Sequence, residues 1–363
     1  MKGTFFLAVI FFSWSLSAAA EMVYRGEQTL WQDTVWEGEI LIDGVLTVAP
    51  EVVLEIRPGT RVSFTFMDSN ADGVGEHEMF IQGRLRALGT EDKPVVFTSA
   101  ESRPFSGAWG AINMMMSEED NLLAHCVLQY GYRGYHAHFS RASLTDCVFR
   151  HNVRGLQFQE STVTMKRCRV IDNFNGMQFR DSEVMIDQSR ISGSHWGLRG
   201  LYTDLRLTDC VIENNAINGV HLRDSTLLAD ANRIVGNRRG LYLQRSRAEV
   251  RSNLIAGNSE HGIFLEDSKL EGTHNRLVDN GRSGVRWINS EGLLRANDLS
   301  GNGTYAVIND GNTPLDARGN WWGTVDNSLV GELVRDGSQR SGLAEVFYDE
   351  ALLSPPAELP SLY

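Results

Sequence analysis

Four side chains near the middle of the sequence are of types that could act together on an acidic sugar chain. Arg199, His221 and Tyr242 stand 22 and 21 residues apart, and Arg223 follows His221 by two residues. A lyase needs a cation to neutralise a uronate carboxylate, a base near the α-proton and an acid for the leaving oxygen, and these side chains can fill those roles. No motif assigns the roles, so we expect binding rather than catalysis. If the chain is an enzyme, we expect a polysaccharide lyase.

The spacing of these residues follows a repeat of 21 or 22 residues. One column of the repeat holds only glycine, and a second column holds all four cysteines before it changes to asparagine. The glycines are Gly134, Gly155, Gly176, Gly197, Gly219, Gly240, Gly262 and Gly284. The second column runs Cys126, Cys147, Cys168, Ser189, Cys210, Asn232, Asn253, Asn275, Asn297 and Asn320. Self-similarity at this period indicates a solenoid, in which each unit buries its apolar face against its neighbours.

Each repeat unit contains three short runs in which apolar residues alternate with other residues. Examples are Leu156 with Phe158 and Val163 with Met165, and Val170 marks the third run. Alternation of period two is typical of β-strands, and Gly, Asn and Ser between the runs are typical of turns. No fixed leucine framework with an opposing helix is present, so a leucine-rich repeat is not indicated. Three strands in each short unit predict a parallel β-helix.

Three further stretches resemble the right-handed parallel β-helix family of exported, pectin-lyase-like proteins. They are residues 46–60, residues 83–99 (GRLRALGTEDKPVVFTS) and residues 320–323 (NWWG). The resemblance covers almost the whole mature chain and implies an all-β, right-handed parallel β-helix with three strands per coil and with N- and C-terminal caps. The family includes lyases, hydrolases, epimerases and adhesins, so no single activity is implied. The sequence lacks the paired-aspartate and Gly-His-Gly signatures of polygalacturonases and the Asp-Pro-His-Glu signature of alginate epimerases.

The sequence divides into four parts. Lys2, an apolar run and three alanines predict a signal peptide over residues 1–20, with cleavage near Ala20. We expect N-terminal coils and a cap in residues 21–120, regular repeats in residues 121–323, and a C-terminal cap and tail in residues 324–363, since an open solenoid end needs cover. No later stretch is long and apolar enough for a transmembrane helix. The protein is therefore expected to be exported, to a periplasm or beyond.

Cys126, Cys147, Cys168 and Cys210 are expected to be buried free thiols. Stacked residues on adjacent parallel strands lie about 4.8 Å apart with their side chains pointing the same way. A disulfide needs β-carbons about 3.5 to 4.5 Å apart and a specific torsion. We therefore predict small apolar fillers in an inward ladder, although exported proteins often contain disulfides.

Strand alternation also predicts which side chains leave the core after each column glycine. These outward positions form a stripe rich in arginine, glutamine, histidine and aromatic residues. The residues predicted to bind ligand are Gln157, Gln178, Arg180, Trp196, Arg199, His221, Arg223, Tyr242, Phe264, Glu266 and Arg286. Aromatic faces stack on sugar rings, Gln and Arg bond hydroxyls or carboxylates, and coils about 4.8 Å apart repeat the contact. Tyr242 and Phe264, which we expect to be exposed, favour binding over an ordinary solvated strand face.

Charge is distributed unevenly along the sequence. Residues 21–120 hold 18 acidic and 7 basic residues, whereas residues 121–303 hold 19 acidic and 23 basic ones. Arginine provides 30 of the 34 basic side chains, and its planar fork suits carboxylate, sulfate or phosphate. The repeats therefore favour an anionic partner. The net charge of −12 argues against general nucleic-acid binding.

One loop has residue types that bind calcium. Asp68, Asn70, Asp72 and Glu76 resemble the first part of a calcium loop, with oxygens at alternate positions. The twelfth position is Met79, which cannot supply the usual bidentate carboxylate. We expect no required cofactor, with calcium as the candidate ion and a solvated acidic loop as the alternative.

Two other groups allow a chemical and a structural interpretation. His136 and His138 leave the same face of one strand, so they could chelate a metal, but no third ligand is evident and we expect surface histidines. Another column could supply the two carboxyls of a hydrolase. Because its acids precede the column serines, turn chemistry is the preferred interpretation. These acids are Glu160, Asp181, Asp224 and Asp267.

The sequence thus predicts an exported β-helix protein that binds an extended, anionic polysaccharide along the stripe. A rigid structural or envelope-assembly scaffold that binds another protein is the alternative from a different functional class. A polysaccharide lyase or hydrolase is the third hypothesis.

Overall fold

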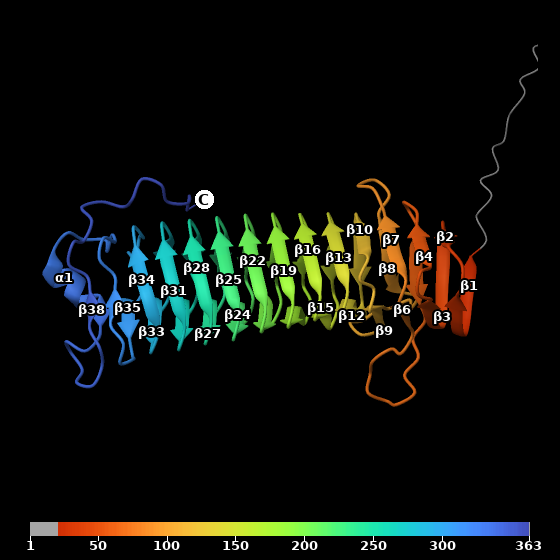
Figure 1. Cartoon of the computed structure of the whole chain (residues 1–363), viewed down its shortest axis with the longest axis horizontal. Helices are drawn as coiled ribbons and strands as arrows, with labels where there is room; N and C mark the ends of the chain where they lie inside the picture. The colour runs from red at the N-terminus through yellow and green to blue at the C-terminus, as the bar shows by residue number, and fades with distance from the viewer. Residues whose placement is uncertain (1–20, 363) are drawn as a thin grey trace, which may run out of the picture.

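The computed structural model describes residues 21–362. The predicted signal peptide over residues 1–20, with its cleavage site near Ala20, lies outside the described residues. The chain winds into an elongated solenoid whose strands pair in parallel with the strands of neighbouring coils (Figure 1). The predicted all-β parallel β-helix is confirmed.

Each regular coil has three strands, and equivalent strands stack into three faces. The glycine face consists of β6 (Glu78–Ile81), β9 (Trp109–Met115), β12 (Gly131–His138), β15 (Arg154–Gln159), β18 (Asn175–Arg180), β21 (Leu198–Leu201), β24 (Asn218–Arg223), β27 (Arg239–Gln244), β30 (His261–Glu266), β33 (Ser283–Ile288), β35 (Tyr305–Asn309) and β37 (Val334–Arg335). The second face consists of β2 (Thr34–Trp36), β4 (Val53–Ile56), β7 (Arg84–Leu88), β10 (Asp120–Ala124), β13 (Arg141–Thr145), β16 (Thr162–Lys166), β19 (Glu183–Asp187), β22 (Asp204–Thr208), β25 (Thr226–Asp230), β28 (Arg247–Arg251), β31 (Lys269–Thr273), β34 (Glu291–Arg295), β36 (Leu315–Asp316) and β38 (Val346–Phe347). The third face consists of β5 (Arg61–Phe64), β8 (Val95–Ser99), β11 (Cys126–Gln129), β14 (Val148–Arg150), β17 (Arg169–Ile171), β20 (Arg190–Ser192), β23 (Val211–Glu213), β26 (Arg233–Val235), β29 (Leu254–Ala256) and β32 (Arg276–Val278).

Two long strands at the N-terminal end join the third face to the glycine face. β1 (Met22–Leu30) pairs along its whole length with β3 (Glu39–Val48). The first part of β3 pairs with β5 and the last part pairs with β6. The two faces therefore count as one sheet of 24 strands, while the second face is a separate sheet of 14 strands.

Buried asparagines hold successive coils together at two of the turns. Asn253 is typical: its Oδ1 accepts from the backbone N and the Nδ2 of Asn232 at 2.8 and 2.9 Å, and its Nδ2 donates to Asn275 Oδ1 at 3.0 Å. A second ladder repeats this geometry, as in Asn237 and Asn258. The side-chain amides thus satisfy backbone groups that the turns would otherwise leave unpaired.

The cysteines occupy the same ladder at its N-terminal end. All four are buried and free, so the prediction of stacked thiols is confirmed. Their Sγ atoms contact main-chain carbonyls, for example Cys210 Sγ with Thr208 O at 3.2 Å. Hydrogen bonding between neighbouring thiols and burial raise the pKa of Cys147 and Cys168, and burial raises the pKa of Cys210 to about 11.

The column glycines are required by the close approach of successive coils. A β-carbon added at Gly197 would lie 2.4 Å from the carbonyl oxygen of Gly219, and one added at Gly240 would lie 2.5 Å from that of Gly262. Contacts this short force the backbone to move. Glycine at this column therefore allows successive strands of the glycine face to approach each other closely.

The C-terminal end departs from the repeat. A short helix, α1 (Asn327–Glu332), begins after Asp326, whose side chain accepts from the backbone N of Ser328. The tail then runs back over the coils (Figure 1), where Arg233 Nη1 donates to the carbonyl of Leu362 at 3.1 Å. Within residues 21–362, no helix has the length and apolarity needed to cross a membrane.

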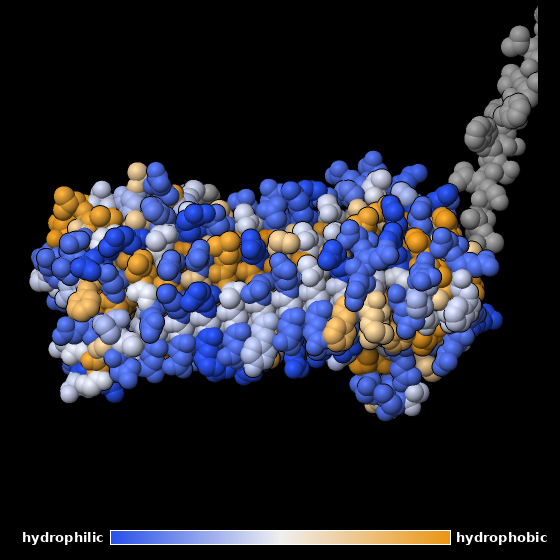
Figure 2. Space-filling view, viewed as in Figure 1, coloured by the Kyte–Doolittle hydropathy of each residue, from blue (hydrophilic) through white to orange (hydrophobic). Residues whose placement is uncertain are grey.

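The surface seen in Figure 2 is mainly polar, with an interrupted apolar strip along the solenoid axis. Many large apolar side chains lie inside the coils, where Phe158 and Phe179 stack at 5.4 Å and Trp109 and Trp287 are fully buried. Chemistry must therefore come from the outward side chains of the strand faces and corners.

Candidate functional site

The strand register places the stripe on the glycine face as the alternation predicts. Two outward columns run along this face. The first pairs His136, Gln157, Gln178, Arg199, His221, Tyr242, Phe264 and Arg286 in order. The second contains His138, Gln159, Arg180, Leu201, Arg223, Gln244, Glu266 and Ile288.

The aromatic side chains of the stripe stack on one another. The rings of His221 and Tyr242 are 4.6 Å apart, and those of Tyr242 and Phe264 are 4.8 Å apart, each nearly parallel. The guanidinium of Arg286 covers Phe264 at 4.8 Å. Phe264 is only 5% exposed, so the expectation of an exposed ring was wrong. The spacing of adjacent parallel strands suits ring stacking, so neighbouring side chains cover the faces of these rings.

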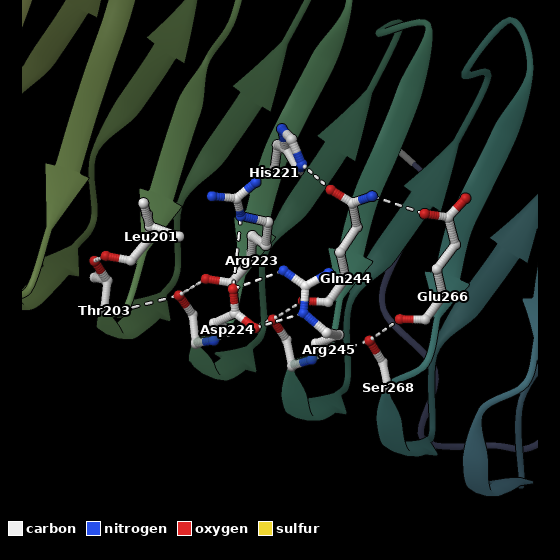
Figure 3. A network of polar contacts seen from close by, with 11 residues as sticks. Leu201, Thr203, His221, Arg223, Asp224, Gln244, Arg245, Glu266 and Ser268 are labelled. Atoms are coloured by element: carbon white, nitrogen blue, oxygen red, sulfur yellow. Dashed lines mark hydrogen bonds and ion pairs between the residues drawn. The ribbon is translucent and has the colours of Figure 1, made fainter.

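A hydrogen-bonded chain crosses the same coils (Figure 3). The ring Nε2 of His221 lies 3.1 Å from Gln244 Oε1, and Gln244 Nε2 donates to Glu266 Oε2 at 2.7 Å. Tyr242 donates its hydroxyl to the same Glu266 oxygen at 2.8 Å. Burial, followed by this contact with Glu266, raises the pKa of Tyr242 to about 12, so the phenol is protonated at neutral pH.

The chain also fixes the tautomer of His221. An ionised Glu266 only accepts hydrogen bonds, so the Gln244 amide must turn its nitrogen to Glu266 and its oxygen to His221. The imidazole then donates through Nε2, and Nδ1 carries the lone pair. Burial lowers the pKa of His221, and the nearby Arg199 and Arg223 lower it further. The ring is therefore a neutral base at physiological pH.

Ion pairing distinguishes the arginines of the stripe. Three of the four arginines predicted to bind ligand already contact a carboxylate. These are Arg180 with Asp181 at 3.1 Å, Arg223 with Asp224 at 3.6 Å and Arg286 with Asp310 at 3.1 Å. Within residues 21–362, Arg199 has no carboxylate oxygen within 4.0 Å, and its guanidinium lies 5.2 Å from the Trp196 ring. Arg199 is thus the stripe arginine with its charge available.

The four predicted catalytic residues lie on consecutive coils, but only two keep their functional groups free. Arg199 and His221 are in register on β21 and β24. Arg223 contacts a carboxylate at its own corner, and the Tyr242 hydroxyl is bonded while its ring is sandwiched. The arrangement leaves one cation and one neutral base side by side.

Two arginines that the sequence reasoning missed lie at the N-terminal end of this face. Arg133 and Arg154 directly precede the column glycines Gly134 and Gly155, and both donate to Gln157 Oε1, at 3.0 and 2.7 Å. Gln157, a predicted ligand residue, is only 8% exposed for this reason. The signal was present in the sequence, because the same column also holds Trp196, Arg239 and His261.

His136 is not the surface histidine that we expected. It is 8% exposed, and its Nδ1 lies 2.9 Å from Asn113 Oδ1. His138 lies beside it at 5.5 Å between ring centroids and contacts Gln159. In the described part of the chain, no group of three or more His, Cys, Asp or Glu side chains is arranged to hold a metal.

The acidic column lies at the corner between the glycine face and the second face. Its four members have φ between 48° and 50°, the left-handed conformation of a tight turn, as the turn interpretation expects. They line an open groove of about 1260 Å³. Arg245, which also lines this groove, bonds both oxygens of Asp224, at 2.7 and 2.8 Å (Figure 3).

The residues of the predicted calcium loop bond to the loop itself. Asp68 accepts from the backbone N of Gly73 at 2.9 Å, Asn70 from that of Asp72 at 2.9 Å, and Glu76 from Ser69. These contacts form turns without a cation. The calcium site stays a prediction.

A family model and one solved structure agree with this architecture. A family model described as a right-handed β-helix region matches residues 158–321. A point mutant of the periplasmic alginate epimerase AlgG shares the fold with a TM-score of 0.60 and 16% identity, over 85% of this chain and 77% of that chain. Pectate lyase Pel9A gives a TM-score of 0.32 at 13% identity, over 88% and 72%, and an Acinetobacter phage tailspike gives 0.38 at 9%, over 89% and 60%. No curated protein sequence matches the chain.

Proposed function

Because this chain is a right-handed parallel β-helix protein, we propose that it is exported and binds an extended, anionic polysaccharide along the stripe. The contact centres on Trp196, Arg199 and His221. The observation that carries the proposal is the guanidinium of Arg199, which lies over an indole ring and has no carboxylate partner in residues 21–362. The periplasmic protein that shares the fold is named for its action on alginate, a polyuronate, which supports testing acidic glycans first.

The residues around Arg199 supply complementary contacts. A guanidinium binds a carboxylate through two parallel hydrogen bonds. Gln178, in register on the neighbouring strand β18, makes no side-chain hydrogen bond within the described residues and can bond sugar hydroxyls. His221 offers Nδ1 as an acceptor, and the half-buried Trp196 offers an apolar surface for a sugar ring. Because strands repeat about every 4.8 Å, a glycan lying along the axis meets these groups in succession.

The stripe predicted from the sequence is thereby reduced in extent. Tyr242, Phe264 and Arg286 stabilise the solenoid surface by stacking, and Gln244 with Glu266 completes the hydrogen-bonded chain. We assign ligand contact to the first outward column from Gln157 on β15 to His221 on β24, which does not include Arg180. The later coils hold His221 in place.

The proposal is tested by measuring affinity for polyguluronate, polygalacturonate and neutral mannan by isothermal titration calorimetry. Arg199→Gln removes an unpaired charge, and we expect a loss of about tenfold or more for the acidic polymers. Arg180→Gln is the matched control, because Arg180 lies on the same face but is paired with Asp181 and should change affinity much less. Absence of acidic-polymer binding by the native protein, or equal affinity of Arg199→Gln, would overturn the proposal. Capture of another protein through the stripe would then favour the scaffold alternative.

The free Nδ1 of His221 favours a second candidate function, a polysaccharide lyase. Arg199 would neutralise the uronate carboxylate and His221 would remove the α-proton. The C–O bond to the next sugar would break as the double bond forms, and water would protonate the leaving oxygen. This activity is tested by monitoring the ultraviolet absorbance of unsaturated oligosaccharides released from polyuronates. His221→Ala should abolish it while leaving the fold intact. If the native protein releases no unsaturated product from any polyuronate, the stripe is a binding face.

A further inference from the structure

A second cationic cluster lies on the same face, two coils before Arg199. Arg133 on β12 and Arg154 on β15 are in register. Their side chains converge on Gln157 Oε1, and their guanidinium groups lie 4.8 and 5.4 Å from the ring of Tyr132. Two cations therefore share one neutral acceptor and one aromatic ring.

The two arginines of this cluster form no direct ion pair within the described residues. Neither Arg133 nor Arg154 has a carboxylate oxygen within 4.0 Å in residues 21–362. Glu78 is the nearby acid that interacts with Arg133 through space, and burial raises the Glu78 pKa. Burial also lowers the pKa of Arg133, with the charge of Arg154 adding to the effect. Each guanidinium has five N–H donors, so most of these donors await a partner.

The wall beside the arginines contains a buried polar atom without a partner. Asn113 donates to Glu78 Oε2 at 2.8 Å, so its Oδ1 accepts from His136 Nδ1 at 2.9 Å. Burial lowers the pKa of His136 to about 3, so the ring is neutral with its lone pair on Nε2. Within residues 21–362 this atom is buried without a hydrogen bond of normal geometry. The charges of Arg133, His138 and Arg154 also lower the pKa of His136, whereas a contact with Gln159 raises it. Buried polar atoms are normally satisfied, so this one indicates an unfilled site.

The backbone is irregular at the same place. The register between β12 and β9 shifts between Arg133 and His136, so β12 contains one extra residue relative to Ala111 and Asn113. Such β-bulges redirect side chains and are common next to functional sites. On its other side β12 pairs with β15 in regular register, and Arg133 donates to Gln157 on that strand.

We propose that Arg133 and Arg154 form a carboxylate-binding subsite that takes one uronic acid residue of the polysaccharide. This inference rests on the proposed function and gives it a second anchor. Strands β15 and β21 are separated by β18 alone, so Arg154 and Arg199 lie about 10 Å apart along the axis. A polyuronate lying on the face meets both anchors, and a neutral glycan meets neither.

The test uses the double variant Arg133→Gln/Arg154→Gln in the full exported chain. The control is Arg167→Gln/Arg251→Gln, which removes two exposed arginines that are already paired, with Asp146 and Asp230. Monomeric galacturonate, its methyl ester and dextran sulfate serve as probes, with binding followed by calorimetry and by thermal shift. Circular dichroism and Arg133→Lys/Arg154→Lys show whether a loss reflects misfolding or the missing charge.

We expect the native protein and the control to bind galacturonate but not its ester, and the double Gln variant to lose this binding. For the polymer, we expect affinity to fall about tenfold or more and the salt dependence to weaken. Equal affinity and equal salt dependence of the double variant overturn the subsite, and stronger binding of dextran sulfate than of polyuronate overturns its carboxylate specificity. If polymer binding depends on Arg199 but not on Arg133 and Arg154, the proposed function stands and the subsite is refuted. If galacturonate binding depends on Arg133 and Arg154 but the polymer does not bind, the subsite stands and the proposed function is refuted.

Discussion

Replacing Asn253 by alanine should show how strongly the asparagine ladder holds the coils together. Asn253 is fully buried, and its Nδ2 also donates to the carbonyls of Ala229 and Arg251, at 2.9 and 2.8 Å. Alanine removes all of these contacts and leaves the backbone N–H of Asn232 without an acceptor. No water can enter without opening the coil, because the surrounding positions are closely packed.

The expected cost follows from the groups left unpaired. Each buried donor or acceptor without a partner costs about 1–3 kcal/mol. At least the Asn232 N–H and the Ala229 carbonyl lose their only side-chain partner, so we expect a loss of about 3–5 kcal/mol. Asn253→Cys should lose less, because equivalent positions of the column hold cysteine and Cys210 Sγ contacts two carbonyls there.

Urea unfolding followed by circular dichroism measures the free energy of unfolding of both variants. Hydrogen exchange at the flanking coils shows whether the damage is local, as expected when each coil contacts its neighbours. A loss below about 1 kcal/mol for Asn253→Ala, or a cysteine variant no more stable than the alanine variant, would refute the reasoning that these amides satisfy otherwise unpaired backbone groups.

Three further outcomes are expected. Burial lowers the pKa of His136 to about 3 and that of His261 to about 4. As the pH falls below about 6.5, these histidines take up protons in the unfolded chain before they do so in the folded protein, so the free energy of unfolding should decrease. The double variant His136→Gln/His261→Gln should show a urea midpoint that depends less on pH. The buried thiols should not react with Ellman's reagent until the chain unfolds, and rapid reaction of folded protein would contradict their burial. Gly240→Ala should cost about 1–3 kcal/mol or more by urea unfolding, whereas Gly257→Asn, at positive φ with no atom within 4 Å of the added β-carbon, should be nearly neutral.

The fold was predictable because the repeat fixes the register. Once the columns were aligned, the inward position of Cys126 and the pairing of Gln157 with Gln178 followed from strand alternation alone, and the structure confirms both. A solenoid has few alternative arrangements, since each unit must bury its apolar side against the next.

The site was less predictable, because alternation gives the direction of a side chain and not its neighbours. Phe264 points outward as expected but is covered by rings on adjacent coils. The partner of Arg286 is Asp310, 24 residues later, beyond the equivalent position of the next coil. The convergence of Arg133 and Arg154 on Gln157 comes from hydrogen bonds between side chains, which the column spacing alone does not specify.

The uniform stacking of the coils places equivalent side chains at fixed, equal intervals along the solenoid axis. The separation between Arg154 and Arg199 is set by a whole number of repeat units, so it changes only in increments of about 4.8 Å. Loss or duplication of one unit between them would leave every other unit in register while moving the two positive charges relative to each other. Matching to a polymer with a different charge interval thus requires a change in repeat number, without any change in side chains.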